Sequence, residues 1–165
     1  MQSTLNNMRK IITLLLCFLI LTGCHSNDAS LKLYNEMIEI LSSAEEFTSN
    51  SKYFTVTYEV TNTNDGIRYY IVIDNPTMAM YDVNVIAFEN GADTENEFAP
   101  NAGIFDDEIN LVPNQINIDK GYAKGISISG ICSDSTNTVF CLVQWKDEKN
   151  LKIYREFLKL SNSEQ

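Results

Sequence analysis

Hydrophobic and polar residues alternate along most of the chain after residue 50, with turn signals between the alternating segments. In residues 54–60 every second position is apolar, and residues 67–73 repeat the pattern. Such alternation is typical of half-buried β-strands. Asp65-Gly66 lies between the two segments and supplies the positive φ that a hairpin turn needs, and Asn75-Pro76 ends the second segment. The pattern therefore predicts two antiparallel strands joined by a tight turn.

The rest of the chain predicts further short strands with no helices between them. Residues 81–89 are partly apolar on both faces, which indicates a central strand. The other predicted strands are 111–118, 122–131, 138–146 and 152–160. A series of strands without alternating helices favours an antiparallel β-sandwich over a parallel α/β sheet. We therefore expect a mainly β fold.

A helical pattern precedes the strands, over residues 29–46, and Asn27 and Asp28 can cap its first turn. One apolar stripe follows the i, i+3, i+7, i+10 spacing of a buried helix face, formed by Leu31, Tyr34, Ile38 and Leu41, with Met37 and Ala44 beside it. We expect the helix to pack on the domain that follows. The alternative is a spacer or partner-binding helix near a membrane.

Residues 89–108 carry seven acidic residues and no Lys or Arg, with Gly91, Pro100 and Gly103 as breakers. We expect a long loop. Residues 93–97 imitate the first ligands of an EF-hand calcium loop. However, Phe98 occupies the position of the EF-hand glycine and Ile104 that of the bidentate glutamate. An irregular calcium site therefore remains as the alternative to a solvated loop. Phe98 and Phe105 indicate that the loop packs back on the domain or meets a partner.

The N-terminus carries a targeting signal. Arg9 and Lys10 precede an apolar run over residues 11–21, which is the layout of a signal peptide. Eleven helical residues span only about 17 Å, roughly half of the hydrocarbon core, so a permanent membrane span is disfavoured. The residues that follow, Leu21-Thr22-Gly23-Cys24, resemble the lipobox of bacterial lipoproteins.

That resemblance implies cleavage between Gly23 and Cys24 and a diacylglyceryl group on Cys24. Two acyl chains anchor a protein stably, whereas one anchors it only marginally. The alternative is an ordinary secretory signal with an incidental cysteine. The sequence thus divides into a signal peptide (1–23), a lipidated N-terminus with a membrane-proximal helix (24–50), and a β-sandwich domain (51–165).

A second resemblance lies within the predicted strands. The segments 70–76, 81–88 and 111–114 resemble the FxLYD-type domains of bacterial lipoproteins, in which a strand ends in an asparagine-containing turn, a Tyr/Leu-Asp-Val strand follows, and a Leu-x-Pro-Gly element comes later. Here Asn114 replaces the usual glycine, and the FxLYD signature itself is absent. The resemblance implies an immunoglobulin-like sandwich that works outside the cytoplasm and has no shared catalytic site.

Removal of the signal changes the charge of the exported part. Residues 1–23 contain Arg9 and Lys10 and no acidic residue, so the net charge of −10 becomes −12 after cleavage. An acidic body repels phosphate groups, which excludes nucleic acid as a partner and argues against a domain that lies on anionic lipid. The lipid therefore has to provide the anchor.

The cysteines and the histidine limit the chemistry. If Thr136-Asn137 forms a two-residue turn, Cys132 faces Cys141 across a hairpin within disulfide reach; two buried free thiols are the alternative. The only histidine, His25, lies beside the proposed lipid site, so no Ser-His-Asp site and no His-based zinc site is expected.

Trp145 is expected in the core, with an exposed recognition anchor as the alternative. A carboxylate pair for glycan hydrolysis would come from the acidic loop, where the candidates are Asp93, Glu95, Glu97, Asp106, Asp107 and Glu108.

These patterns predict a membrane-anchored extracytoplasmic lipoprotein on the cell membrane or the outer membrane. We expect a non-enzymatic binding or interaction module of the cell envelope, with a protein partner and no cofactor or metal. The alternatives are an immunity or exclusion lipoprotein against a toxin or phage, and a carboxylate-based glycan hydrolase.

Overall fold

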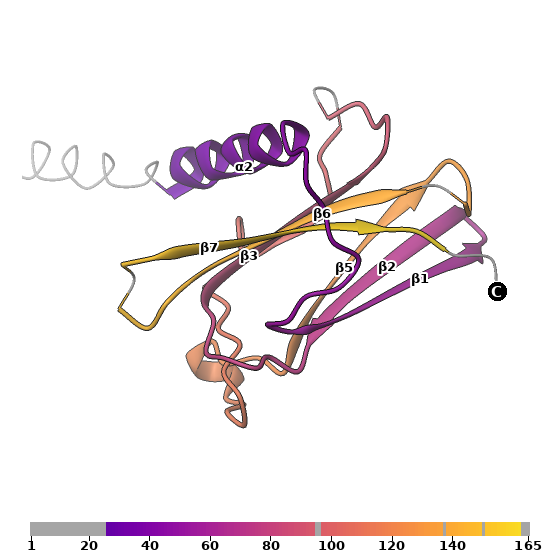
Figure 1. Ribbon diagram of the computed structural model, residues 1–165. Helices are drawn as coiled ribbons and strands as arrows, with labels where there is room; N and C mark the ends of the chain where they lie inside the picture. The colour runs from indigo at the N-terminus through magenta and orange to yellow at the C-terminus, as the bar shows by residue number, and fades with distance from the viewer. Residues whose placement is uncertain (1–25, 95–96, 137, 150, 163–165) are drawn as a thin grey trace, which may run out of the picture.

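The computed structural model describes residues 26–94, 97–136, 138–149 and 151–162, and these form two antiparallel sheets (Figure 1). The first sheet has the order β1-β2-β5 and the second the order β4-β3-β6-β7. The strands of the first sheet are β1 (Thr55–Thr63), β2 (Gly66–Asp74) and β5 (Gly125–Cys132). Those of the second are β3 (Tyr81–Glu89), β4 (Asn101–Ala102), β6 (Val139–Lys146) and β7 (Ile153–Leu160).

The main core lies between the two sheets. Alternate residues of β2, namely Tyr69, Ile71 and Ile73, are buried in the same cluster as residues of β3 and β6. Trp145 of β6 belongs to this cluster and is fully buried. The prediction of a mainly β antiparallel sandwich is therefore confirmed, and so is the core position of Trp145.

Helix α2 (Ser26–Ser42) covers the outer face of the four-stranded sheet (Figure 1). Its buried residues Tyr34, Met37 and Leu41 pack on Ile86 of β3 and Leu142 of β6. The helix therefore packs on the domain, as expected. Because β3 and β6 are covered by the other sheet on one face and by α2 on the other, residues 83–87 and 141–145 are buried without interruption.

The buried face of the helix differs from the predicted stripe. Leu31 is exposed, whereas Met37 is fully buried. The helix also ends at Ser42, four residues before the predicted end. After it the chain turns onto the edge of β7, where the Thr48 N–H donates to Phe157 O (2.9 Å) and Lys159 N–H donates to Thr48 O (2.9 Å). Pairing with a strand edge uses these backbone groups in place of further helical hydrogen bonds.

The prediction of a strand over residues 111–118 is wrong. The segment contains only isolated bridges, followed by the 3₁₀ helix η1 (Ile118–Lys120). Leu111 exchanges two backbone hydrogen bonds with Met80, both of 2.8 Å. Beyond it, Pro113 has no N–H to donate and Asn114 has a φ of 61°, so the chain turns away from the sheet.

The predicted hairpin between Cys132 and Cys141 is also wrong. Cys132 lies on β5 opposite Ile67 of the first sheet, and Cys141 lies on β6 opposite Ala87 and Leu158 of the second. Both are buried free thiols in the core between the sheets. The strands on either side of this loop belong to different sheets: β5 pairs with β2, and β6 pairs with β3 and β7.

Candidate functional site

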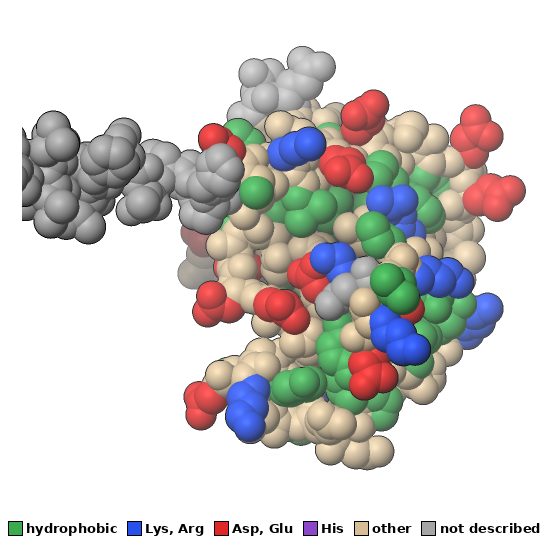
Figure 2. Space-filling model, turned by 90° about the vertical axis from the view of Figure 1, so that its left-hand side faces the viewer, with side chains coloured by type: hydrophobic (Ala, Val, Ile, Leu, Met, Phe, Trp, Pro, Cys, Tyr) green, Lys and Arg blue, Asp and Glu red, His purple; other side chains and the backbone are tan. Residues whose placement is uncertain are grey.

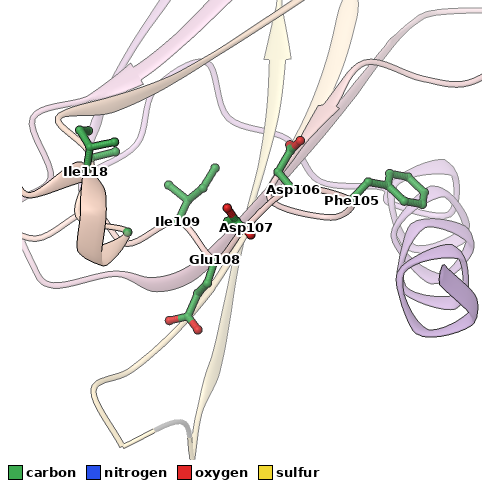
Figure 3. Close-up of a pocket in the computed structure, with 8 residues that line it drawn as sticks. Phe105, Asp106, Asp107, Glu108, Ile109 and Ile118 are labelled. Carbon is green, nitrogen blue, oxygen red and sulfur yellow. The ribbon is translucent and has the colours of Figure 1, made fainter. Parts of the chain in front are cut away.

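A groove of about 610 Å³ opens between residues 105–109 and residues 118–123 (Figure 3). We call it the acidic groove. Its lining comprises Phe105, Asp106, Asp107, Glu108, Ile109, Ile118, Gly121 and Ala123. Three of these eight described residues are carboxylates and none is Lys or Arg, whereas the other five are apolar residues or glycine. Such a surface suits a ligand that is cationic and partly hydrophobic.

The first wall of the groove is held by helix α2. The ring of Phe105 lies 5.7 Å from that of Tyr34, and Phe98 stacks on the same Tyr34 ring at 4.8 Å. The Tyr34 hydroxyl accepts a hydrogen bond of 2.7 Å from the Ala99 N–H. Figure 3 shows Phe105 pointing from the groove towards the helix. The expectation that the acidic loop packs back on the domain is therefore confirmed.

A glycine brings this wall against β3. Gly103 has a φ of 78°, and a Cβ at this position would lie 2.1 Å from Val83 O. Only glycine accepts both the positive φ and so close an approach to backbone. The Gly103 N–H donates to Asp106 Oδ2 (3.3 Å), and the Val83 N–H donates to Ile109 O (2.8 Å). One oxygen of the Asp106 carboxylate thus stabilises the turn in which Asp106 itself lies.

The second wall is tied to the first through Asn110. The Asn110 N–H donates to Gly121 O (2.7 Å), and the Ala123 N–H donates to Asn110 O (2.9 Å). Gly121 ends η1 with a φ of 74°, and a Cβ there would lie 2.6 Å from Glu108 O. The two walls therefore form one hydrogen-bonded unit.

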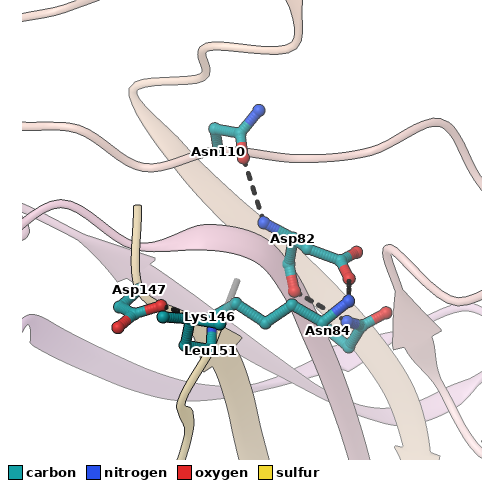
Figure 4. Close-up of polar contacts among 6 residues, drawn as sticks. All are labelled: Asp82, Asn84, Asn110, Lys146, Asp147 and Leu151. Atoms are coloured by element: carbon teal, nitrogen blue, oxygen red, sulfur yellow. Dashed lines mark hydrogen bonds and ion pairs between the residues drawn. The ribbon is translucent and has the colours of Figure 1, made fainter. Parts of the chain in front are cut away.

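Asn110 also joins this unit to an irregular point of the sheet (Figure 4). Asp82 has a φ of 48° and lies where the β3–β6 register shifts. Its N–H donates to Asn110 Oδ1 (3.0 Å), its carbonyl accepts from Asn84 Nδ2 (2.8 Å), and its carboxylate pairs with Lys146. These contacts stabilise a left-handed conformation that most residues avoid, and they fix the base of the acidic groove to β3 and β6.

The carboxylates of the groove do not converge. Figure 3 shows Asp106 and Glu108 pointing in opposite directions, with Asp107 between them. Of the other predicted carboxylates, Asp93 and Glu97 line a separate hollow of about 290 Å³, and Glu95 lies outside the described residues. In the part of the chain that the structure describes, no cluster of three or more His, Cys, Asp or Glu residues could hold a metal ion.

The two cysteines are shielded from solvent. Burial raises the pKa of the Cys141 thiol to about 12, and burial followed by the nearby Glu89 carboxylate raises the pKa of Cys132. Thiolates are the reactive form of cysteine. Both residues therefore act as small apolar groups of the core at neutral pH.

Sequence reasoning identified one wall of the groove and missed the other. The acidic residues 106–108 stood out as a cluster, but residues 118–123 were assigned to a strand and a strand start. Pro113, which has no N–H to donate to a strand ladder, followed by Asn114, is the sequence signal that could have separated segment 111–118 from a strand.

Comparisons with protein-family models, with curated proteins and with solved structures gave no match to this chain. Gly23 and Cys24, the expected site of cleavage and lipidation, lie outside the described part of the structure. Within the described part, no helix has the length and apolar character needed to cross a bilayer.

Proposed function

We propose that the protein is a lipid-anchored, non-enzymatic binding module of the cell envelope, in which the acidic groove holds a basic and partly apolar segment of another envelope protein. The observation that carries the proposal is the groove itself. It is lined by three exposed carboxylates, Asp106, Asp107 and Glu108, and by the exposed Ile118, on walls tied together by backbone hydrogen bonds.

The anchor is supported by the N-terminal sequence. The charged segment, the short apolar run and Leu21-Thr22-Gly23-Cys24 together have the order that lipidation requires. Helix α2 begins at Ser26, two positions after Cys24. The sandwich would then be joined to its lipid by a packed helix with almost no linker between them.

Cys24→Ala tests the anchor. The variant should lose the diacylglyceryl mass and the cleavage at Cys24, because the cysteine sulfur is the acceptor. Mass spectrometry of the purified full-length product and membrane fractionation measure both effects. Cys17→Ala is the matched control, since Cys17 lies within the apolar run and should leave processing intact. A Cys24→Ala protein that is still cut and lipidated would rule out the anchor.

Neutralising the groove tests the binding site. We would combine Asp106→Asn, Asp107→Asn and Glu108→Gln and titrate the purified lipoprotein in detergent with a fluorescent peptide of alternating lysine and leucine. Three partly exposed ion pairs at about 0.5 kcal/mol each predict a roughly tenfold weaker Kd. The effect should shrink at high salt, because ions screen exposed charges.

A second triple variant controls for net charge. Glu45→Gln, Glu46→Gln and Glu59→Gln remove the same three charges from exposed positions on other parts of the surface. This control should leave the Kd nearly unchanged. Equal affinities of the two triple variants would show that the peptide responds to overall charge, and the groove would then not be its site.

The charge of the groove also favours a second function, that of an immunity or exclusion lipoprotein. Its partner would be a cationic toxin or phage component that acts on the envelope. Cells producing the protein should then survive such an agent, and the groove triple variant should lose the protection. The divergent carboxylates give no support to glycan hydrolysis, because that reaction needs two carboxyl groups facing one bond.

A further inference from the structure

The positive charges of this acidic protein are concentrated in one hairpin. Of the ten Lys and Arg residues that follow Cys24, five lie on the β6–β7 hairpin, namely Lys146, Lys149, Lys152, Arg155 and Lys159. Lys146 pairs with Asp82, and Arg155 lies 3.7 Å from Glu36. Lys149 and Lys152 are exposed at the turn, and the Lys152 ammonium lies 4.4 Å from the centre of the Tyr154 ring.

The acidic residues of the turn are Asp147 and Glu148, and Asp147 is engaged in the turn itself. Its Oδ1 accepts a hydrogen bond from the Leu151 N–H (2.9 Å; Figure 4) and another from the Lys152 N–H (3.3 Å). This carboxylate therefore faces the backbone that it caps. Glu148 is exposed, so the two outward lysines exceed the outward acid by one charge.

The same turn carries exposed apolar side chains. Leu151 is 82% exposed and Ile153 is 50% exposed. Single exposed leucines are ordinary, but here two large aliphatic residues flank Lys152 at the end of a hairpin. Aliphatic side chains next to lysines are the combination that inserts into the interface of an anionic bilayer.

The hairpin tip lies at the end of the molecule where α2 begins (Figure 1). Phe47, after the helix, contacts Phe157, and Glu36, within the helix, lies beside Arg155. Moving along α2 towards its N-terminus thus means moving along β7 towards the tip. Figure 2 views this end of the molecule: Lys and Arg side chains lie among hydrophobic ones in the middle and right of the face, and Asp and Glu side chains lie both beside them and along the outline.

We propose that the β6–β7 tip, through Leu151, Ile153, Lys149 and Lys152, is a second membrane contact that docks on anionic lipid beside the lipid anchor. The inference rests on the proposed function, because the lipid on Cys24 is what brings this end of the molecule to the bilayer. Two points of attachment restrict rotation of the sandwich about its anchor. The net charge of −12 disfavours a domain that lies flat on anionic lipid, but screening limits each charge to about 8 Å at physiological salt, so the charges near the tip decide this contact.

Tryptophan fluorescence in proteoliposomes tests the contact. The intact lipoprotein carrying Leu151→Trp would be reconstituted into phosphatidylglycerol and phosphatidylcholine vesicles with brominated acyl chains. The new tryptophan should be quenched roughly twofold, because it enters the interface. Ile131→Trp is the matched control: Ile131 is 60% exposed and lies at the opposite end of the sandwich, beside Gly66. The native Trp145 is fully buried and supplies the background.

Charge is tested by adding Lys149→Glu and Lys152→Glu to Leu151→Trp, which should remove most of the quenching. Vesicles of phosphatidylcholine alone should also quench less. Equal quenching of Leu151→Trp and Ile131→Trp would overturn the contact, and so would quenching that ignores both charge changes. If the tip were shielded from solvent in native envelopes but not in lipid vesicles, it would contact a protein partner. That outcome would likewise overturn the proposed membrane contact.

Mass spectrometry of the same preparation separates this inference from the anchor. Absence of the acyl groups with quenching retained would remove the anchor and keep the contact. Acylated protein without quenching at position 151 would keep the anchor and remove the contact.

Discussion

The hydroxyl of Tyr34 is a specific link between helix α2 and the acidic loop, and Tyr34→Phe removes it alone. The variant keeps the ring that contacts Phe98 and Phe105. It removes the oxygen that accepts the Ala99 N–H at 2.7 Å in a buried position. The Ala99 N–H then loses the acceptor that it has in the structure. Leaving a buried donor unsatisfied costs about 1–3 kcal/mol, more than the net contribution of an average hydrogen bond.

Two measurements test this cost. The free energy of unfolding from urea titrations should fall by about 1–3 kcal/mol. Hydrogen exchange at the Ala99 amide should become roughly 5- to 150-fold faster by the same free energy, if the loop opens without global unfolding. Tyr34→Ala should lose more, because each aromatic contact contributes about 0.5–1.5 kcal/mol beyond its buried area.

Tyr70→Phe is the control for loss of a phenol. Tyr70 lies on β2 with its side chain exposed, so its hydroxyl can bond to water and its removal should change stability by less than about 0.5 kcal/mol. If Tyr34→Phe and Tyr70→Phe have the same stability and the same exchange at Ala99, the hydrogen bond does not hold the loop. The groove wall formed by Phe105 would then depend on the aromatic contacts alone.

Two further predictions concern the groove turn and the core thiols. Gly121→Ala should lower the midpoint of thermal unfolding much more than Gly91→Ala. Both glycines have positive φ, but at Gly121 the new Cβ would lie 2.6 Å from a backbone oxygen, whereas at Gly91 nothing lies within 4 Å of it. Equal shifts of the midpoint in calorimetry would contradict this prediction. The protein should also lose stability at alkaline pH, because burial raises the pKa of Cys141 from 9.0 to about 12 and that of Tyr58 from 10.0 to about 12. The folded state holds these protons more tightly than the unfolded state, so the stabilisation is complete below about pH 9 and falls as the pH rises towards 12; for the fully buried Cys141 it is on the order of 4 kcal/mol. Urea titrations at several pH values measure it, and a Cys141→Ala variant with an undiminished alkaline slope would contradict the assignment.

Local patterns determined a large part of this fold. The alternation in residues 67–73 placed Tyr69, Ile71 and Ile73 on one buried face, as the structure has them. The apolar character of both faces of 81–89 marked a strand covered on both sides, and its bounds are those of β3. Such positions can be read locally because a strand shows its environment with a period of two residues.

Only the tertiary structure decided which strands pair. Cys132 and Cys141 are nine positions apart, and a local hairpin was the simplest arrangement, but β5 pairs with β2 and β6 with β3 and β7. The local sequence of an edge strand such as β5 does not indicate whether the next strand, β6, joins the same sheet or the other one. The same holds for α2, where Met37 rather than Leu31 is buried, because the sheet face determines which side of the helix has a partner.

The acidic groove shows the same division. Its negative charge can be read from the sequence, because residues 106–108 are consecutive acidic residues. The structure gave its second wall, because residues 118–123 reach residues 105–109 only through the hydrogen bonds of Asn110 with Gly121 and Ala123. The proposed membrane contact also combines both sources, since lysines and leucine are visible in the sequence but their position beside the start of α2 is not. Composition is additive along the chain, whereas proximity depends on packing between segments that are far apart in sequence.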